Sequence, residues 1–478
     1  MIAKTDASGG SALHPEVLAF SSSLSLDRQL FCEDVIGSLA HLIMLSRQSI
    51  IPKADAAILR DGLVSLWEKH AAGKLVLPNE EDVHMAIEAA LTMAVGKTAG
   101  LLHSARSRND QVALDLRLHV RSQLAGLLPK LSRWMEALAS RAETEMDALL
   151  PSYTHRQRAQ PISFAYLLAG YGAMFVRDGE LLRFVLNQVD ELPLGVGAIA
   201  GSSLPISRDT TRQLLGFSRL TRNGLDTVGD RDFALDYTYA AAKLLLHASR
   251  LSTDFIDFAS QEFGFLKIDG DLACGSSMMP QKRNPDVFEL VRGKSGRAVG
   301  NLMALLVTVK GLPGGYNRDL QEDRQALLET GPLMAGVLDI LQVALPRMKL
   351  DRERALAALM GDYTQATDIA EALVRQGLPF REAYQAVGAL VRRCQEKKLP
   401  LAQATLEMAS TIHPAFNAET LRAAQPGVLM KEVPGSTGPK SVRAQIQALR
   451  ESAQALSALA SGIPTLDTLF AQLREASL

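Results

Sequence analysis

Residues 233–262 read FALDYTYAAAKLLLHASRLSTDFIDFASQE, a stretch without glycine or proline. Apolar side chains recur in it at steps of three or four residues, or at sums of these steps, as they do along one face of an α-helix. The residues with this spacing are Leu235, Tyr239, Leu245, Ala248, Leu251, Phe255 and Phe258. The stretch therefore predicts one long helix, whose apolar face needs other helices to cover it.

Similar helical patterns recur along the chain, whereas alternating, strand-like patterns are scarce. The helical patterns cover residues 112–128, 162–189, 287–309 and 325–345. We therefore predict an all-α fold. Helices that are so long, and apolar over so much of their circumference, cannot all be covered within one small bundle, so we also predict a homo-oligomer.

Composition excludes several classes of function. The 478 residues include 51 basic and 52 acidic side chains, a formal net charge of -1, which does not favour nucleic acid as a partner. The cysteines, Cys32, Cys274 and Cys394, are three in number and widely separated, which argues against a disulfide framework and against a metal-ligand cluster. We expect Cys274 to be a small buried thiol rather than a nucleophile.

Neither the N-terminal segment nor the longest apolar run suggests a membrane protein. Residues 1–11 are polar, without the apolar core of a signal peptide, and we expect them to be disordered. The longest uncharged, mostly apolar run is 298–309, shorter than the roughly 20 residues that cross a membrane. We interpret that run as a buried helix and expect a cytoplasmic protein without membrane contact.

Residues 275–286, Gly-Ser-Ser-Met-Met-Pro-Gln-Lys-Arg-Asn-Pro-Asp, have the composition of an anion-binding loop. Glycine loosens the backbone, two serines offer hydroxyl groups, and Lys282 and Arg283 bring positive charge. The helix that follows would direct its unpaired N–H groups at the same space. Taken alone, the loop could equally be a solvated turn before a helix.

Two more polar segments, 103–111 and 153–161, change this interpretation. With the loop, they resemble, in the same order, the signature segments of the fumarase, aspartase and argininosuccinate lyase superfamily. The segments 107–111, 225–232 and 316–324 resemble the argininosuccinate lyase family specifically. The likeness begins near Leu26 and continues past Val442.

The resemblance implies three helical domains: a small N-terminal domain at 1–104, whose first two dozen residues we expect to be flexible, a central long-helix bundle at 105–359, and a C-terminal domain at 360–478. It also implies that four chains form a homotetramer through their central bundles. Each active site of such a tetramer gathers its signature segments from three different subunits.

The resemblance further assigns catalytic roles. Ser276 matches the family's catalytic serine, with Ser277 as the alternative, and Lys282 would help to stabilise the serine alkoxide. His155 matches the catalytic histidine and suits proton transfer near neutral pH. Which of Ser276 and His155 takes the Cβ proton and which protonates the leaving nitrogen stays open.

The matching segments also supply hydroxyl, amide and cationic groups for a substrate with several carboxylates. We expect these to be Ser38, Ser107, Asn109, Thr154, Asn284, Tyr316, Gln321 and Arg324. No organic cofactor and no metal is required by this chemistry.

Other charged residues in these segments are interpreted as supporting structure. We expect Asp82 to cap a helix, and Asp230, Arg231 and Asp232 to form an ion-pair network rather than a metal site. His84 and His103 are given structural roles. Arg106 and Arg108 are either solvated charges, carboxylate clamps or anchors behind the loop.

The chain departs from the family pattern at a few positions. Ser104 and Ala105 replace Thr-Gly, Arg156 replaces a leucine, Arg324 replaces a lysine, and Gly224 and Gly229 replace serines. None of these removes a group that the chemistry needs.

The resemblance thus implies reversible β-elimination of argininosuccinate to arginine and fumarate. The alternatives are a related lyase that releases fumarate from another N-succinyl amine of the aminopolycarboxylate type, a crystallin-like structural protein of reduced activity, or a helical scaffold.

Overall fold

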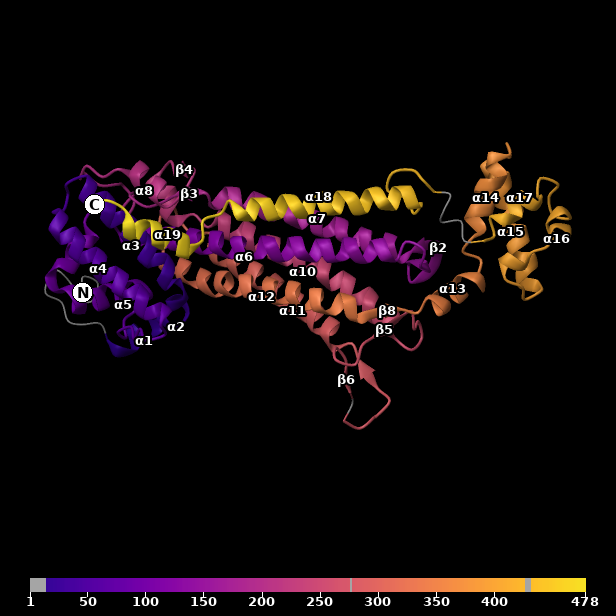
Figure 1. Ribbon diagram of the computed structural model, residues 1–478, viewed down its shortest axis with the longest axis horizontal. Helices are drawn as coiled ribbons and strands as arrows, with labels where there is room; N and C mark the ends of the chain where they lie inside the picture. The colour runs from indigo at the N-terminus through magenta and orange to yellow at the C-terminus, as the bar shows by residue number, and fades with distance from the viewer. Residues whose placement is uncertain (1–13, 276, 426–430) are drawn as a thin grey trace.

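A computed structural model describes residues 14–275, 277–425 and 431–478. Long helices run side by side through its middle, with the N-terminal helices packed at one end and a group of short helices at the other (Figure 1). The all-α prediction is confirmed for the described residues, whose strands are all short. The expectations for residues 1–11 and for Ser276 lie outside the described residues.

The N-terminal helices surround a mostly apolar stretch of α3, in which every residue from Val35 to Leu45 is buried. The last helix of the chain, α19, returns to this end and packs on α3, with Phe470 stacked on Trp67. The elements here are α1 (Pro15–Ser21), α2 (Leu24–Asp27), η1 (Arg28–Leu30), α3 (Phe31–Arg47), α4 (Lys53–Ala71), α5 (Val83–Val95), η2 (Gly96–His103) and α19 (Leu466–Glu475).

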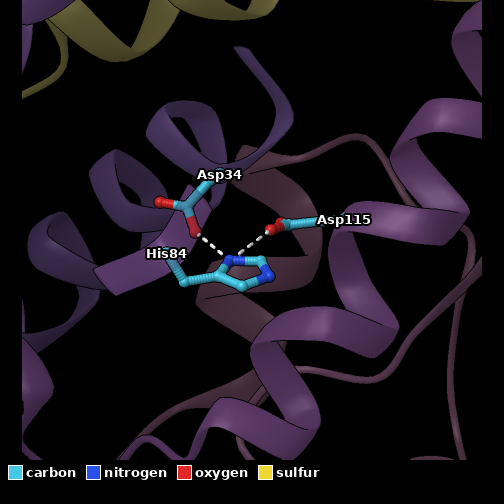
Figure 2. A group of neighbouring side chains, drawn as sticks. All are labelled: Asp34, His84 and Asp115. Atoms are coloured by element: carbon cyan, nitrogen blue, oxygen red, sulfur yellow. Dashed lines mark hydrogen bonds and ion pairs between the residues drawn. The ribbon is translucent and has the colours of Figure 1, made fainter. Parts of the chain in front are cut away.

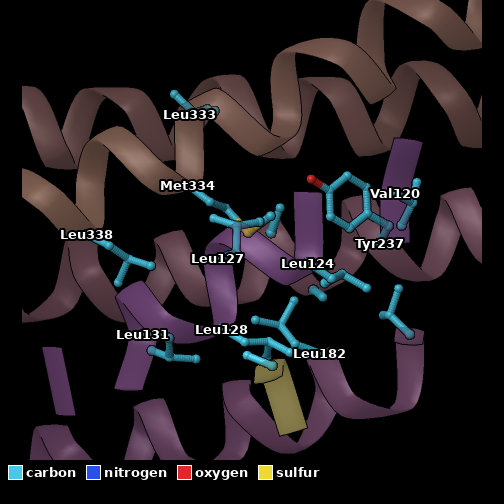
Figure 3. Packing of buried hydrophobic residues seen from close by; sticks show 14 of the residues in the cluster. Val120, Leu124, Leu127, Leu128, Leu131, Leu182, Tyr237, Leu333, Met334 and Leu338 are labelled. Carbon is cyan, nitrogen blue, oxygen red and sulfur yellow. The ribbon is translucent and has the colours of Figure 1, made fainter. Parts of the chain in front are cut away.

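The central bundle forms around α6, which contacts α7, α12 and α18, while α10 packs along α11. Figure 3 shows leucines of α6 between side chains of α7, α10 and α12. Burial of this kind contributes about 1.5–3 kcal/mol per large side chain. The bundle helices are α6 (Arg108–Thr144), α7 (Phe164–Val189), α10 (Asp232–Ala259), α11 (Asp286–Val309), α12 (Asp323–Ala344) and α18 (Pro439–Ser461).

The prediction for α6 was too short. Its periodicity is broken by Pro129, yet the helix continues to Thr144. A proline inside a helix costs about 3 kcal/mol, because it removes one hydrogen bond and crowds the preceding turn. The next two turns bury Leu131, Trp134 and Leu138 completely, which more than offsets that cost.

The expectation of a buried helix at 298–309 was wrong for the single chain. This segment is the second half of α11, and only Ala298 and Leu305 are buried in it. Met303 is 58% exposed and Val307 is 64% exposed. The apolar character of this half of α11 is therefore not used within the chain.

Short helices and strands connect the bundle. The helical ones are α8 (Arg208–Leu214), α9 (Gly224–Gly229), η3 (Arg318–Glu322) and η4 (Leu345–Arg347). The strands form four two-stranded sheets: β1 (Leu149–Thr154) with β2 (Gln157–Ser163), β3 (Glu191–Leu192) with β4 (Arg219–Leu220), β5 (Leu266–Ile268) with β8 (Met348–Leu350), and β6 (Cys274–Gly275) with β7 (Arg283–Asn284). The β3–β4 pair is parallel and the others are antiparallel.

The proposed C-terminal domain holds two packing environments. Residues from Ile369 to Ala424 share a small hydrophobic core of their own. Residues from Val442 to Leu473 instead belong to the core of the bundle and the N-terminal helices. The short helices are α13 (Arg352–Met360), α14 (Ala366–Arg375), α15 (Phe380–Glu396), η5 (Leu401–Gln403), α16 (Leu406–Ser410) and α17 (Ala418–Arg422).

Three described segments are long and apolar enough, by length and composition, to cross a membrane. They are Pro15–Arg47, Val83–His103 and Arg318–Arg347, and the packing of the chain buries 89%, 33% and 56% of their most apolar windows. This corrects the sequence-based estimate, which considered uncharged runs only. Packing inside the chain accounts for the apolar character of the first segment.

Candidate active site

The predicted site residues lie in three places. Six of them gather near the N-terminal helices, where α6 and α12 begin, and we call these the bundle-end group. Two lie in the β1–β2 hairpin at the far end of the bundle, and two more in the β6–β7 ribbon that projects from its side (Figure 1). The bundle-end group is Ser38, Ser107, Asn109, Tyr316, Gln321 and Arg324.

Ser38 is held in a buried hydrogen-bond chain. Its hydroxyl donates to Asp34 Oδ1 at 3.3 Å, one helical turn earlier in α3. The hydroxyl oxygen of Ser38 in turn accepts from Arg106 Nη1 at 2.9 Å. Arg106 therefore acts as an anchor beside Ser38, and Arg108 forms an ion pair of 2.5 Å with Asp82. Asp82 caps α5 by accepting from the Met85 amide, as predicted.

The start of α6 is fixed by a capping box. Ser107 accepts from the Asn109 amide, and Asp110 accepts from the Ser107 amide at 2.9 Å. Asp110 also accepts from the amides of Gly195 and Gly197, which ties the 194–203 loop to this helix. Asn109 donates to the Ala198 carbonyl at 3.2 Å.

Arg324 is almost fully buried at the start of α12. It donates to Asp323 Oδ1 at 2.9 Å, and the other oxygen of Asp323 pairs with Arg231. Arg117 of α6 pairs with Asp230, just before α10. The predicted ion pairs are confirmed for Asp230 and Arg231, whereas Asp232 forms none among the described residues. These contacts tie α6 to the N-terminal ends of α10 and α12.

The two other members of this group lie on the connection into α12. Gln321 donates to the Ser21 carbonyl at 2.9 Å, so the N-terminal helices cover η3. Tyr316 is half-buried, and burial raises the pKa of its phenol. Its hydroxyl therefore stays a neutral hydrogen-bond donor at ordinary pH.

His155 lies at an exposed hairpin tip. Thr154 pairs with Gln157, so His155 and Arg156 form a two-residue turn. Both have positive φ, 55° and 57°, as a type I′ turn requires, although asparagine and glycine usually fill such positions. Arg156 extends to Asp257 near the end of α10, at 3.1 Å. Thr154 is exposed as well.

The β6–β7 ribbon presents Lys282 and Asn284. Lys282 is exposed, and Asn284 pairs with Cys274 across the ribbon. Cys274 is exposed, so the expectation of a buried thiol was wrong: the ribbon projects away from the helical core. The hydrogen bond and negative charge of Asp286 raise the pKa of the Cys274 thiol, which makes it a poor nucleophile.

A single chain does not bring these places together. Arg231, at the bundle-end group, and Asp257, at the hairpin, lie at opposite ends of α10, roughly 40 Å apart at 1.5 Å per residue. Proton transfer requires hydrogen-bond distances. His155 therefore cannot act with the bundle-end group of its own chain in this arrangement.

Beneath the bundle-end group lies a buried cluster of Asp34, His84 and Asp115, here called the Asp34 triad. Figure 2 shows the Nδ1 edge of the His84 ring between the two carboxylates, with Nε2 on the other side. His84 Nδ1 lies 2.6 Å from Asp34 and 3.3 Å from Asp115. Gln111 also donates to Asp34, at 2.5 Å. The predicted structural role of His84 fits these contacts.

The triad has strongly shifted pKa values. Burial opposes the charge on His84, but hydrogen bonds with Asp115 and Asp34 raise its pKa to about 9. Burial would raise the pKa of Asp34, but its hydrogen bond and charge interaction with His84 lower it to about 2. Burial and the charge of Asp34 raise the pKa of Asp115 to about 8. At neutral pH, His84 and Asp34 thus form a charged pair, with Asp115 mostly protonated.

Comparison with known proteins places this geometry in a family. Residues 18–300 match the family model described as lyase, and residues 363–430 match the one described as argininosuccinate lyase C-terminal. The argininosuccinate lyase of Thermosynechococcus vestitus is 43% identical over 444 residues, 92% of this chain and 96% of its own length. That of Moorella thermoacetica is 41% identical over 435 residues, 90% of this chain and 94% of its own. The chain belongs to the argininosuccinate lyase family.

Solved structures agree with membership of the argininosuccinate lyase family. An EDDS lyase in complex with formate has a TM-score of 0.83 and 26% identity, covering 98% of this chain and 95% of that one. A class II fumarase from Schistosoma mansoni has a TM-score of 0.74 and 16% identity, covering 89% of this chain and 98% of that one, which shows a shared fold. The family is therefore one of carbon–nitrogen lyases within the wider superfamily.

Among the described residues, the Asp34 triad is the group whose possible ligand atoms lie close enough together to suggest a metal site. Tetrahedral zinc with ligands near 2.1 Å would separate neighbouring ligand atoms by about 3.4 Å. The 2.6 Å contact between His84 and Asp34 is instead that of a charged hydrogen bond. The geometry therefore fits a protonated imidazole better than a metal.

Sequence reasoning missed Asp34 and Asp115. One signal was available: Asp34 precedes Ser38 by four residues, so both lie on one face of a mostly apolar helix, α3. Asp115 gave no such signal, because its partners lie on other helices. In this argininosuccinate lyase fold, three separate segments supply the triad.

Proposed function

We propose that this protein is an argininosuccinate lyase, which cleaves argininosuccinate reversibly to arginine and fumarate in arginine synthesis or the urea cycle, in the cytoplasm. The likeness to argininosuccinate lyases over nine-tenths of the chain supports the reaction. The substrate class is supported by the bundle end itself, because that end is built to receive carboxylates.

The bundle end offers unused hydrogen-bond donors. Arg106 Nε, Arg108 Nε, Arg231 Nη2 and Arg324 Nε are buried and have no hydrogen-bond partner among the described residues. Donors left in this way cost about 1–3 kcal/mol each unless a ligand pairs with them. The N-terminal ends of α6, α10 and α12 add positive partial charge at the same place. Carboxylates of a succinyl group would supply the missing acceptors.

The elimination needs a base, an acid and groups that stabilise negative charge. A base removes the Cβ proton, and electron density moves onto the neighbouring carboxylate. The C–N bond then breaks with its electron pair going to nitrogen, which an acid protonates, so that arginine and fumarate leave. We assign the proton transfers to Ser276 and His155, in either order, and the stabilisation of an alkoxide to Lys282. The exposed position of His155 leaves it able to enter a site on another chain.

We further propose a homotetramer whose sites are each shared among three subunits. The separation of His155 from the bundle-end group supports sharing. The exposed face of α11 supports assembly, because Gly293, Gly296 and Gly300 recur on it at helical spacing, with no atom of the chain near an added Cβ. Glycines in a helix interior cost about 1 kcal/mol each, a cost that close packing against another helix offsets. Met303 and Val307 extend this face.

A related lyase acting on another N-succinyl amine is the second candidate. The likeness to an EDDS lyase favours it, as do Arg156 and Arg324, which replace residues usual in argininosuccinate lyases. The identity of 43% to an argininosuccinate lyase against 26% to the EDDS lyase favours the first candidate.

Fumarate formation, followed by its ultraviolet absorbance, tests both candidates. Purified protein is mixed with argininosuccinate and, separately, with other N-succinyl amines. We expect release from argininosuccinate alone. Release only from another amine would support the second candidate, and no release from any of them would favour a structural protein of the crystallin kind.

A further inference from the structure

We infer that Asp34 is a positioning residue that holds Ser38 and, through Ser38, Arg106 in the orientation that receives a substrate carboxylate. This inference rests on the proposed function for its ligand, a succinyl carboxylate. Asp34 itself is 1% exposed and accepts three hydrogen bonds, so it orients other groups rather than touching the substrate.

The three donors come from three helices. His84 Nδ1 of α5 and Gln111 Nε2 of α6 occupy Asp34 Oδ2, at 2.6 Å and 2.5 Å. Ser38 of α3 occupies Oδ1, at 3.3 Å. These two hydrogen bonds, from α5 and α6, keep the Asp34 carboxylate from rotating. Its Oδ1, the acceptor for Ser38, therefore stays in one position.

The direction of the Ser38 hydroxyl follows from this arrangement. Its proton points to Asp34, because a carboxylate can only accept. The free lone pairs of its oxygen then face Arg106, whose Nη1 donates to it at 2.9 Å. Without Asp34, the hydroxyl could rotate and compete with Arg106 for the same acceptors.

Arg106 is the group that this chain of contacts presents. Its Nε is buried with no hydrogen-bond partner among the residues described, so one donor of the guanidinium is not satisfied within the chain. A cavity of about 10 Å³, room for about one water molecule, is lined by Asp34, Ser38, His84, Arg106, Arg108 and Gln111, together with apolar side chains, Glu88 and His103. His84 and Asp34 form a charge-balanced pair, so Asp34 does not cancel the charge of Arg106.

A neighbouring pair provides a matched control. Glu33, beside Asp34 in α3, pairs with His119 of α6 at 3.1 Å, and both side chains are buried, though slightly less completely than those of the triad. No hydrogen bond of Glu33 in the described chain reaches Ser38 or Arg106. Both pairs join a buried carboxylate of α3 to a buried histidine. They differ because Asp34 contacts Ser38, whereas Glu33 does not.

The test compares Asp34→Asn with Glu33→Gln in the full-length oligomer. We expect Asp34→Asn to raise the KM for argininosuccinate by about tenfold or more while kcat changes less than about threefold, the pattern of lost substrate binding. Glu33→Gln is expected to leave KM within about twofold while it lowers Tm comparably. Equal effects of both variants on KM, or none from Asp34→Asn, would overturn the inference.

A second readout does not depend on catalysis. Succinate, a dicarboxylate probe, is expected to raise the Tm of the wild type and of Glu33→Gln but not of Asp34→Asn. If succinate shifts Tm in this way but the protein releases no fumarate, Asp34 is still a positioning residue and the proposed reaction is wrong. If the protein releases fumarate but succinate raises the Tm of all three proteins equally, the proposed reaction stands and the inference about Asp34 is wrong. Should Asp34→Asn not fold, His84→Gln against His119→Gln makes the same comparison, with a smaller expected rise in KM.

Discussion

Asp115 carries the largest unrelieved electrostatic cost of the Asp34 triad. His84 Nδ1 lies 2.6 Å from Asp34 but 3.3 Å from Asp115 Oδ2, so the buried carboxyl group of Asp115 has the weaker of the two contacts. Protonation relieves this cost, which is why burial and the charge of Asp34 raise the pKa of Asp115 to about 8. The free energy of unfolding must therefore depend on pH through the protonation of Asp115.

The sign of that dependence follows from proton linkage. An unfolded aspartate has a pKa of about 3.9 and an unfolded histidine about 6.5, both below the folded values of Asp115 and His84. From about pH 4 to pH 9, the folded state thus binds more protons, so rising pH destabilises it. Asp34 acts oppositely: its lowered pKa adds stability above about pH 4, which is lost as pH falls toward 2.

We predict that Asp115→Asn removes much of this decline. The neutral amide cannot ionise, and it can donate to Asp34. The variant therefore avoids the loss of stability that ionisation of the buried Asp115 causes in the wild type between pH 5 and pH 8. Thermal unfolding followed by circular dichroism at several pH values measures the difference in Tm. Parallel curves for the two proteins would show that Asp115 keeps the same charge in the folded and unfolded states.

Some single residues could be predicted from the sequence and others could not. Asp82 follows a local rule, because a cap bonds to its own helix, and the prediction was correct. Cys274 was misjudged, since its burial depends on whether a ribbon folds onto the bundle. Asp34 was missed because two of its three donors come from other helices. Ser38 was found only through resemblance.

At the scale of elements, periodicity predicted α7 and α10 to within a few residues. It failed at Pro129, where burial outweighs a local penalty. It also gave no hairpin between α6 and α7, because His155 and Arg156 are unusual residues for a type I′ turn. Local patterns thus predict elements whose stability is local, and miss those that depend on packing or on a strained turn.

The contact between α9 and the 311–316 loop leads to a second prediction. A Cβ added at Gly229 would lie 2.7 Å from the Gly315 carbonyl oxygen. Gly229→Ala should therefore destabilise the protein by about 1–3 kcal/mol and displace the loop that carries Tyr316. Gly126→Ala, in an exposed part of α6 with open space around the added Cβ, should instead stabilise by about 1 kcal/mol.

Denaturant unfolding with parallel measurement of KM checks this pair. The effect on KM separates loop displacement from simple loss of stability, because Tyr316 is expected to contact the substrate while Gly126 is remote from the bundle-end group. If both alanine variants shift stability in the same direction, the close approach of α9 and the loop is not what selects glycine at 229.

At the scale of the whole molecule, the proposed site depends on the proposed assembly. Helix periodicity predicted that apolar surface would exceed what one chain can cover, and α11 shows such a surface. No local pattern could place His155 of one chain beside Asn109 of another, because that depends on how bundles pack. The long distance between His155 and the bundle-end group within one chain predicts that a complete site needs more than one chain.

Mixing two inactive variants tests whether the site is shared. His155→Asn lacks the proton-transfer group at the hairpin, and Asn109→Ala lacks an amide at the bundle end, so each homo-oligomer should be inactive or nearly so. If each site takes the two groups from different chains, random reassembly of equal amounts makes both groups intact in about one quarter of the sites. If one chain supplied both groups, every site would keep one defect and no activity would return. Fumarate release after dissociation and reassembly, with each variant treated alone as control, measures the recovered fraction, and a solution mass of a single chain would exclude sharing altogether.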